Sequence, residues 1–173
     1  MRLLTLIILM LLSLPILMPE SQSLPEVSKG IGDKLEAPVE LPIKGVDEEE
    51  LHCMTLALYK ESRGEPERGS ILVSQVIMNR VQSKKFSNSV CSVVKKKLAG
   101  NCMFSFWCHP NREKINDIES YKRLTEIAYN AILGKYKGVT TSTFFKVCSV
   151  KSKFFDKLRY KGRIGNHCFY EEY

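Results

Sequence analysis

Apolar and polar positions recur with a helical period over much of the chain after residue 46. Spacings of three and four bring four residues onto one helix face: Leu51, Met54, Leu58 and Glu61. Asp47 followed by Glu50 is the pattern of a capped helix start, with Asp47 as the N-cap. Gly64 and Pro66 end the periodic run. We therefore predict a helix from Asp47 to this corner.

Three further helices are expected. One begins near Pro66 and runs through "GSILVSQVIMNRV"; its apolar residues cover much of its circumference, which predicts that it is the central helix. "SNSVCSVVKKK" predicts a short helix capped by Ser87 or Asn88. "SYKRLTEIAYNAILG" predicts a helix that ends at Gly134 and turns these residues inward: Leu124, Ile127, Ala128, Ala131 and Ile132.

The C-terminal part changes character. "VTTSTFFKVC" and "RIGNHCFYEEY" are rich in β-branched and aromatic residues, and each predicts one short strand. The expected fold class is α+β, mainly helical, with a small C-terminal antiparallel strand pair. Residues 46–173 suit a single domain with one core.

The N-terminal part lies outside this domain. Residues 1–23 have one arginine, an apolar run and small residues at the end, which is typical of a secretory signal peptide. The run is short for a membrane span, which needs about 20 apolar residues, and an uncleaved anchor is the alternative. Residues 24–45 carry prolines and little periodicity and are interpreted as a linker or pro-segment. We expect an exported protein of the periplasm or cell envelope, with membrane contact only through this segment.

The chain has a net charge of +7, and its basic residues are clustered at residues 95–97 and 146–163. A basic exported domain is suited to an anionic lipid or an acidic wall polymer, and export argues against a nucleic acid as partner. A solvated basic face is the alternative. Nothing in the pattern indicates an oligomeric state.

Six cysteines in an exported chain predict disulfides. If the two C-terminal strands run antiparallel, Cys148 and Cys168 can face each other, and we predict a bond between them. Each of the three histidines adjoins a cysteine, which raises the question of zinc. The spacings do not match those of a zinc site. We expect no metal and no cofactor.

Glu61 continues an apolar stripe rather than a charged face. Burial there would raise the pKa of its carboxyl, which suits a general acid near neutral pH. Pairing with Arg63 or Arg80 would lower the pKa instead. Spacing alone leaves both interpretations open.

Four blocks in order carry a resemblance: "LALYKESRGEPERGSILVSQVIMNRVQS", "FSNSVCSVV", "CMFSFWC" and "RIGNHCFY". Together they resemble the SleB-type cell-wall hydrolases of bacteria and phages, in a cysteine-bearing branch typical of Gram-negative bacteria. The resemblance implies a lysozyme-like fold and a lytic transglycosylase acting on peptidoglycan glycan strands. It implies that Glu61 is the catalytic acid, followed by Ser62, and that Glu65 orders the corner through hydrogen bonds.

Other candidate residues surround this assignment. An aromatic loop suited to sugar faces comprises Phe104, Ser105, Phe106 and Trp107, although core burial is an equal alternative for Trp107. Asn79 is a candidate for binding an acetamido group, and His167 is expected to be structural. Two departures affect substrate contacts: Met103 replaces a usual Gln, and Phe144–Phe145 replace a His-Tyr pair.

The remaining four cysteines are expected around the aromatic loop. We predict bonds Cys91–Cys102 and Cys53–Cys108, which would tie that loop to the helix carrying Glu61.

Three other functions stay open. The domain can be a non-catalytic wall-binding or lysozyme-inhibiting module, or a catalytically inactive relative used as a scaffold. It can also be a glycoside hydrolase that uses Glu65 as a second carboxylate. Bacterial wall remodelling and phage lysis are both compatible with the sequence.

Overall fold

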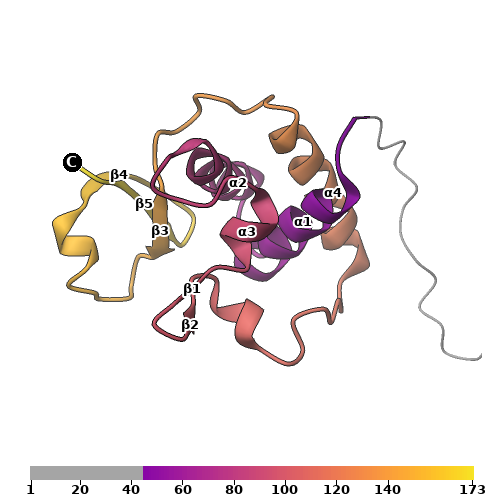
Figure 1. Cartoon of the computed structure of the whole chain (residues 1–173), viewed down its shortest axis with the longest axis horizontal. Coiled ribbons are helices and arrows are strands. Elements are labelled where there is room, and N and C mark those ends of the chain that lie inside the picture. Colours follow the sequence, from indigo (N-terminus) through magenta and orange to yellow (C-terminus); the bar gives the residue numbers. More distant parts are fainter. Residues whose placement is uncertain (1–44) are drawn as a thin grey trace, which may run out of the picture. The chain divides into compact units, whose positions relative to one another are not determined.

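The computed structural model describes residues 45–173 (Figure 1). Four α-helices, two 3-10 helices and five strands occur in this part of the chain. In order they are α1 (Glu48–Ser62), α2 (Glu67–Gln82), α3 (Val90–Val94), β1 (Lys97–Leu98), β2 (Asn101–Cys102), η1 (Ser105–Cys108), α4 (Ile118–Ile132), β3 (Phe144–Val147), η2 (Phe155–Lys157), β4 (Arg159–Ile164) and β5 (His167–Glu171). The predicted class, α+β and mainly helical, is confirmed.

The central helix is α1, and the prediction that α2 holds this position was wrong. Helix α1 contacts α2, α3 and α4, and every residue of its segment 53–59 is buried. In α2, Ile71, Leu72 and Met78 are only partly buried. Helix α2 also contacts the other three helices, but it keeps a partly exposed side, whereas α1 is enclosed by its neighbours along residues 53–59.

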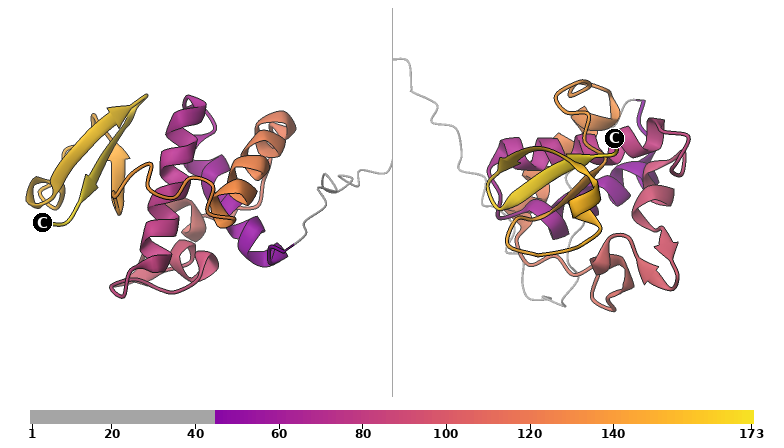
Figure 2. Two further views of the ribbon diagram at one scale, coloured as in Figure 1. Left: turned by 90° about the horizontal axis from the view of Figure 1, so that it is seen from above. Right: turned by 90° about the vertical axis from the view of Figure 1, so that its left-hand side faces the viewer.

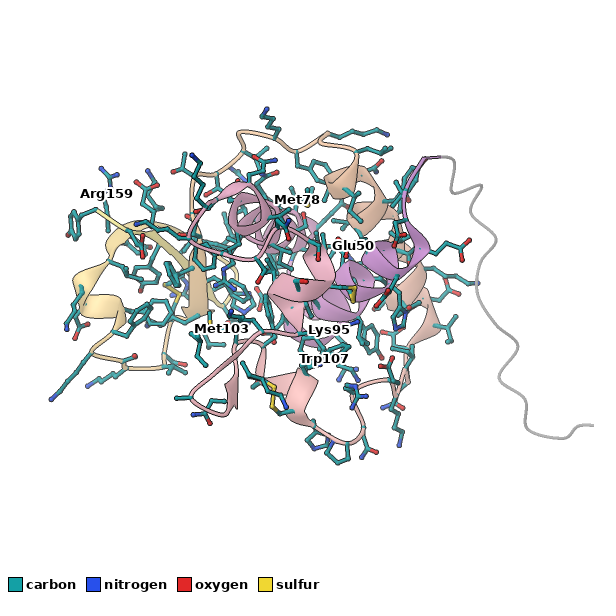
Figure 3. All side chains as sticks on the ribbon, viewed as in Figure 1. Glu50, Met78, Lys95, Met103, Trp107 and Arg159 are labelled. Atoms are coloured by element: carbon teal, nitrogen blue, oxygen red, sulfur yellow. A yellow bond between two sulfur atoms is a disulfide. The ribbon has the colours of Figure 1, made fainter. Side chains whose placement is uncertain are left out.

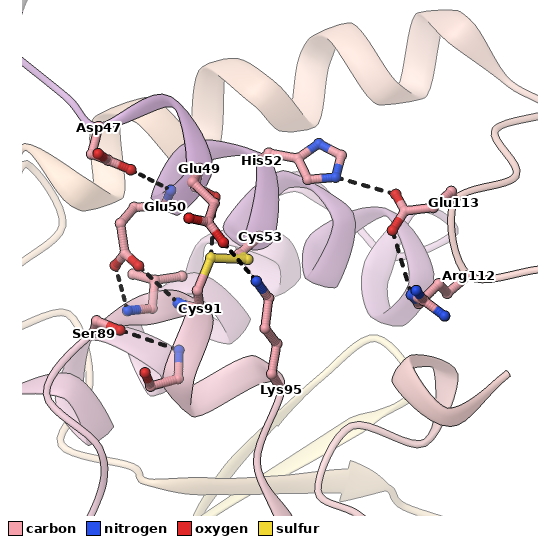
Figure 4. The surroundings of a disulfide bond; sticks show 12 residues. Asp47, Glu49, Glu50, His52, Cys53, Ser89, Cys91, Lys95, Arg112 and Glu113 are labelled. Carbon is pink, nitrogen blue, oxygen red and sulfur yellow. Dashed lines mark hydrogen bonds and ion pairs between the residues drawn. A yellow bond between two sulfur atoms is a disulfide. The ribbon is translucent and has the colours of Figure 1, made fainter.

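Local capping explains where the helices begin. Asp47 accepts a hydrogen bond from the backbone N–H of Glu50 at 2.9 Å, as predicted. The cap of α3 is Ser89, rather than Ser87 or Asn88. The carboxylate of Glu50 supplies the physical reason, because it accepts from the backbone N–H of Val90 at 2.5 Å and fixes the first turn there (Figure 4).

The C-terminal strands form a three-stranded antiparallel sheet in the order β3-β5-β4, rather than the predicted pair. Figure 2 shows this sheet beside the helices, where β3 contacts α2. The block predicted as one strand turns back on itself between β4 and β5. Gly165 adopts a φ of 56°, a left-handed conformation that breaks a strand and suits glycine. Only the last two residues of β4 fall within the predicted block, so this strand was missed, and the turn at Gly165 shortens the block to β5.

The predicted signal peptide and linker lie outside the described residues, apart from residue 45. Within residues 45–173, no helix combines the length and apolar character that crossing a membrane requires.

Candidate active site

Glu61 lies in the last turn of α1, at the corner with α2. Its side chain is partly buried, and no described residue forms a hydrogen bond or ion pair with it. Burial raises the pKa of Glu61 to about 7, while the positive charge of Arg80 acts in the opposite direction. A carboxyl with this pKa is protonated in a large fraction of molecules near neutral pH. It can therefore donate a proton there.

The two arginines considered as partners of Glu61 bind elsewhere. Arg63 donates to the hydroxyl of Tyr59 at 3.0 Å. Arg80 is buried and donates to the backbone carbonyl of Thr143 at 2.6 Å. Its guanidinium also lies over three rings at 5.4 to 5.5 Å, those of Phe86, Phe104 and Phe144. Of the two alternatives that the sequence left open, burial outweighs pairing.

Arg80 also sets the local electrostatics. Burial lowers the pKa of its guanidinium to about 10, and Glu61 opposes that shift. A group with this pKa remains a cation at neutral pH. It therefore limits how far the pKa of Glu61 rises, and it stabilises the carboxylate once a proton has left.

Glu65 has a very different environment. One carboxylate oxygen accepts from the backbone N–H of Asn166 at 2.9 Å, and the other accepts from the Asn166 side-chain amide at 3.1 Å. A Cβ on Gly165 would lie only 1.9 Å from the first of these oxygens. The glutamate thus holds the β4–β5 turn against the start of α2, consistent with the predicted ordering role.

His167 is buried beside this contact. Its ring packs edge-on against Phe145, with centroids 5.3 Å apart. Burial lowers the pKa of His167, although Glu65, whose oxygen lies 4.0 Å from Nδ1, opposes that shift. A neutral imidazole packed against an aromatic ring supports the expected structural role.

Ser62 and Asn79 use their polar groups within the protein. The hydroxyl of Ser62 donates to the backbone carbonyl of Leu58 at 2.9 Å. The Asn79 side-chain amide donates to the carbonyls of Thr140 and Ser142, each at 2.9 Å, and its oxygen accepts from Gln75. Asn79 therefore fixes the segment that leads into β3, and its contact with an acetamido group stays a prediction.

The predicted aromatic loop is partly ordered as η1. Phe104 is buried and contacts the rings of Phe106 and Phe145, so it belongs to the core. Ser105 is exposed, and Phe106 and Trp107 are half-buried. The cations of Lys95 and Arg112 lie 5.5 and 5.1 Å from the Trp107 ring, and Figure 3 shows Lys95 beside Trp107. Only the second half of this loop presents aromatic surface.

The two sequence departures also lie in this region. Met103 is partly buried against the core, and Phe144 is buried. Phe145 is partly buried and contacts Phe169 and His167. Phe144 and Phe145 thus join the sheet to the rest of the core through contacts with Phe86 and Phe104.

The disulfides differ in part from those predicted. Cys148–Cys168 is present, with Cα atoms 5.1 Å apart. Cys168 pairs in register with Lys146, so Cys148 reaches it diagonally from just beyond β3. The predictions Cys91–Cys102 and Cys53–Cys108 were wrong. The bonds are Cys53–Cys91, which joins α1 to α3 (Figure 4), and Cys102–Cys108, which closes the aromatic loop on itself.

The physical reason lies in the short elements of this region. Helix α3 packs directly on α1, and this brings Cys91 to Cys53. The β1–β2 hairpin and η1 fold the loop back, which brings Cys102 to Cys108. In the described part of the chain, one group has the composition of a metal site, Glu49 with Cys53 and Cys91. Its two sulfurs are bonded to each other and cannot act as thiolate ligands.

Sequence reasoning missed two contributors to the site. Arg80 was considered only as a partner of Glu61, and Asn166 was not considered. A signal for Asn166 was present in the sequence. The dipeptide "GN" is typical of a turn, and its position inside a β-rich block could have indicated a turn there.

Comparisons with known proteins agree with this architecture. A family model described as "Cell Wall Hydrolase" matches residues 64–170, beginning three residues after Glu61. A spore cortex-lytic enzyme of Bacillus subtilis (strain 168) is 28% identical over 131 residues, which are 73% of this chain and 39% of that protein. One from Oceanobacillus iheyensis is 33% identical over 79 residues, 43% of this chain and 29% of that protein. The chain thus spans about two fifths or less of these relatives.

Two solved structures are similar in fold. One is the catalytic domain of the germination-specific lytic transglycosylase SleB from Bacillus anthracis, with a TM-score of 0.59 and 27% identity; the match covers 74% of this chain and 98% of that one. The other is the catalytic domain of the Bacillus cereus SleB protein, with a TM-score of 0.57 and 26% identity over 74% and 94% of the two chains. The predicted lysozyme-like fold is confirmed by these neighbours.

Proposed function

This chain belongs to the cell wall hydrolase family, as its four sequence blocks predicted, and we propose that it cleaves peptidoglycan as an exported lytic transglycosylase. The bond cut is the glycosidic bond between N-acetylmuramic acid and N-acetylglucosamine. The observation that carries the proposal is the environment of Glu61, a partly buried carboxyl with a pKa of about 7 and no hydrogen-bond partner in residues 45–173. The similar catalytic domain from Bacillus anthracis, described as a lytic transglycosylase, supports it.

In the proposed reaction, protonated Glu61 donates its proton to the glycosidic oxygen as the bond from that oxygen to C1 of the muramic sugar breaks. The acetamido group of the same sugar stabilises the positive charge at C1. The sugar's own 6-hydroxyl then attacks C1, and the Glu61 carboxylate accepts the hydroxyl proton. No water is consumed, the product has a 1,6-anhydro end, and Glu61 returns to its protonated form.

A single carboxyl suffices for this sequence of steps. Hydrolases that invert or retain configuration usually need two, one on each side of the bond. Both oxygens of Glu65 accept hydrogen bonds from Asn166. This engagement favours a positioning role for Glu65 and supports the one-carboxyl mechanism over the two-carboxyl alternative.

Export is supported by the signal-like residues 1–23 and by the three disulfides in the described residues, which persist in oxidising compartments. The substrate is then the peptidoglycan of the cell envelope. Its anionic character suits a chain with a net charge of +7.

Mass spectrometry of the products released from purified sacculi tests the proposal. We expect 1,6-anhydromuramic ends from the wild-type protein and no release from Glu61→Gln. Reducing ends that incorporate ¹⁸O from labelled water would instead indicate a hydrolase. Binding to sacculi without any release by the wild-type protein would indicate a wall-binding module.

A further inference from the structure

A cavity of about 380 Å³ lies on the C-terminal sheet, outside the site built around Glu61. Its lining includes three lysines, one acid and two aromatic rings: Lys146, Lys151, Lys153, Asp156, Phe155 and Tyr170. The chain between β3 and β4 provides most of them and extends away from the helices (Figure 1). A volume of this size is in the range of small-molecule sites, about 300–1,000 Å³.

Strand alternation separates this cavity from Glu61. Phe145 packs against Phe104 and Phe169, so this side of β3 and β5 is turned toward the helical core. Lys146 and Tyr170 are the next residues along these strands and therefore point to the opposite face. A ligand in the cavity would lie across the sheet from the aromatic contacts that adjoin Glu65.

The wall of the cavity is held in place by its own contacts. The amine of Lys146 donates to the carbonyls of Val150 and Cys148, at 2.6 and 3.4 Å. The same amine lies over the rings of Phe155 and Tyr170, at 5.6 and 5.7 Å. The bond Cys148–Cys168 closes the base of this segment. One positive charge is therefore fixed at the cavity before any ligand arrives.

The charges on the lining are unbalanced. Lys151 and Lys153 are exposed, and in the described part of the chain neither side chain has an ion-pair or hydrogen-bond partner. Asp156 likewise has no hydrogen-bond or ion-pair partner among residues 45–173, and it provides one negative charge against three positive ones. The cavity thus suits a ligand that carries more than one carboxylate, one amine and some apolar surface.

We infer that this cavity binds the acidic peptide stem of peptidoglycan while Glu61 acts on the glycan, an inference that rests on the proposed function. The stem carries the free carboxylates of γ-linked glutamate and of a diamino acid, and the latter adds an amine. The carboxylates match Lys151 and Lys153, the amine matches Asp156, and alanine methyl groups match the aromatic wall. The enzyme accordingly prefers glycan strands that still carry peptides.

A binding titration tests the site directly. The probe is the tripeptide L-alanyl-γ-D-glutamyl-meso-diaminopimelate, added to the full-length protein and followed by calorimetry. We expect Lys151→Gln with Lys153→Gln to weaken binding by about tenfold or more, the factor that 1.4 kcal/mol represents. The matched control is Lys135→Gln with Lys137→Gln, an exposed pair with the same spacing and charge change outside the cavity. The control should bind within about twofold of wild type.

Three results would overturn the inference. The first is no tripeptide binding by the wild-type protein at millimolar concentration. The second is equal weakening by the cavity and control variants, which would reflect net charge alone. The third is full competition by inorganic phosphate at the same concentration, which would mark a general anion site.

Two further measurements separate failure of this inference from failure of the proposed function. Glu61→Gln should bind the tripeptide like the wild-type protein, because the cavity does not include that residue. Turnover is measured on sacculi and on peptide-free glycan strands prepared with an amidase. The ratio of the first turnover to the second should fall about fivefold or more in the variant with Lys151→Gln and Lys153→Gln, and it should stay constant in the control variant. An unchanged ratio with intact 1,6-anhydro products would overturn only the peptide site.

Discussion

Two glutamates four positions apart, Glu61 in the last turn of α1 and Glu65 in the corner before α2, have opposite hydrogen-bonding environments. Glu61 is partly buried and has no hydrogen-bond donor among the described residues, so burial raises the pKa of its carboxyl to about 7. Glu65 is also well buried, with an 8% exposed side chain, but Asn166 donates to both of its oxygens. The two carboxyls are therefore distinguished by their hydrogen-bond donors rather than by burial alone.

The largest expected effect is on catalysis at Glu61. Glu61→Gln keeps the shape of the side chain and removes the titrating proton, so the rate of muropeptide release should fall by about 10²–10⁴-fold. Thermal unfolding followed by circular dichroism should show an intact fold. Retention of more than about a tenth of the wild-type rate would contradict the assignment of Glu61 as the general acid.

The turn that partners Glu65 can be disrupted from the other side. Gly165→Ala adds a Cβ that would lie 1.9 Å from a Glu65 oxygen, at a φ of 56°. We expect a loss of about 2–4 kcal/mol in the free energy of unfolding, from backbone strain together with the displaced carboxylate. Gly138→Ala is the control, because its φ of 87° is also positive but no atom lies within 4 Å of the added Cβ. Equal losses in urea titrations would show that strain alone is responsible.

Removal of the charge on Glu65 should have a smaller effect. Glu65→Gln keeps one acceptor oxygen for Asn166 but loses a charge-assisted hydrogen bond, which should cost about 1–3 kcal/mol in the free energy of unfolding. The rate of muropeptide release should fall far less than in Glu61→Gln. A rate as low as that of Glu61→Gln, in a folded protein, would instead assign Glu65 a catalytic role.

The smallest expected effect is a pH-dependent stability difference at Glu61. Because its pKa is raised from 4.5 to about 7 in the folded protein, the folded state binds more protons than the unfolded state between these pH values. The contribution of Glu61 to the free energy of unfolding is therefore present at low pH and is lost as the pH rises through about 7. Glu61→Gln should be more stable than wild type at pH 8, on the order of 1–2 kcal/mol, and not at pH 4. Parallel stability curves for the two proteins would contradict the shift.

Local signals in the sequence account for the features that were predicted correctly. Asp47 with Glu50 defines the start of α1 through one hydrogen bond within a single turn, and Gly134 ends the region of α4 with a positive φ of 79°. The apolar stripe that includes Glu61 predicted its partial burial. These features depend on residues within four positions of each other, where sequence patterns are informative.

Several contacts that depend on long-range packing could not be predicted from the sequence. The amide of Asn79 is occupied by carbonyls 61 and 63 positions away, and Glu65 meets Asn166 across 101 positions. Cys53 pairs with Cys91 because α3 packs on α1, and cysteine spacing carries no information on that contact. The candidate acid could be identified from sequence, whereas the contacts that engage Glu65 and Arg80 elsewhere could not.

The most direct test of the account is an NMR titration of the Glu61 carboxyl carbon in protein labelled with ¹³C at glutamate Cδ, with the resonance assigned by its loss in Glu61→Gln. We expect Glu61 to titrate with a pKa of about 7. A pKa near the ordinary glutamate value of about 4.3 would contradict the claim that burial prepares this residue to act as an acid.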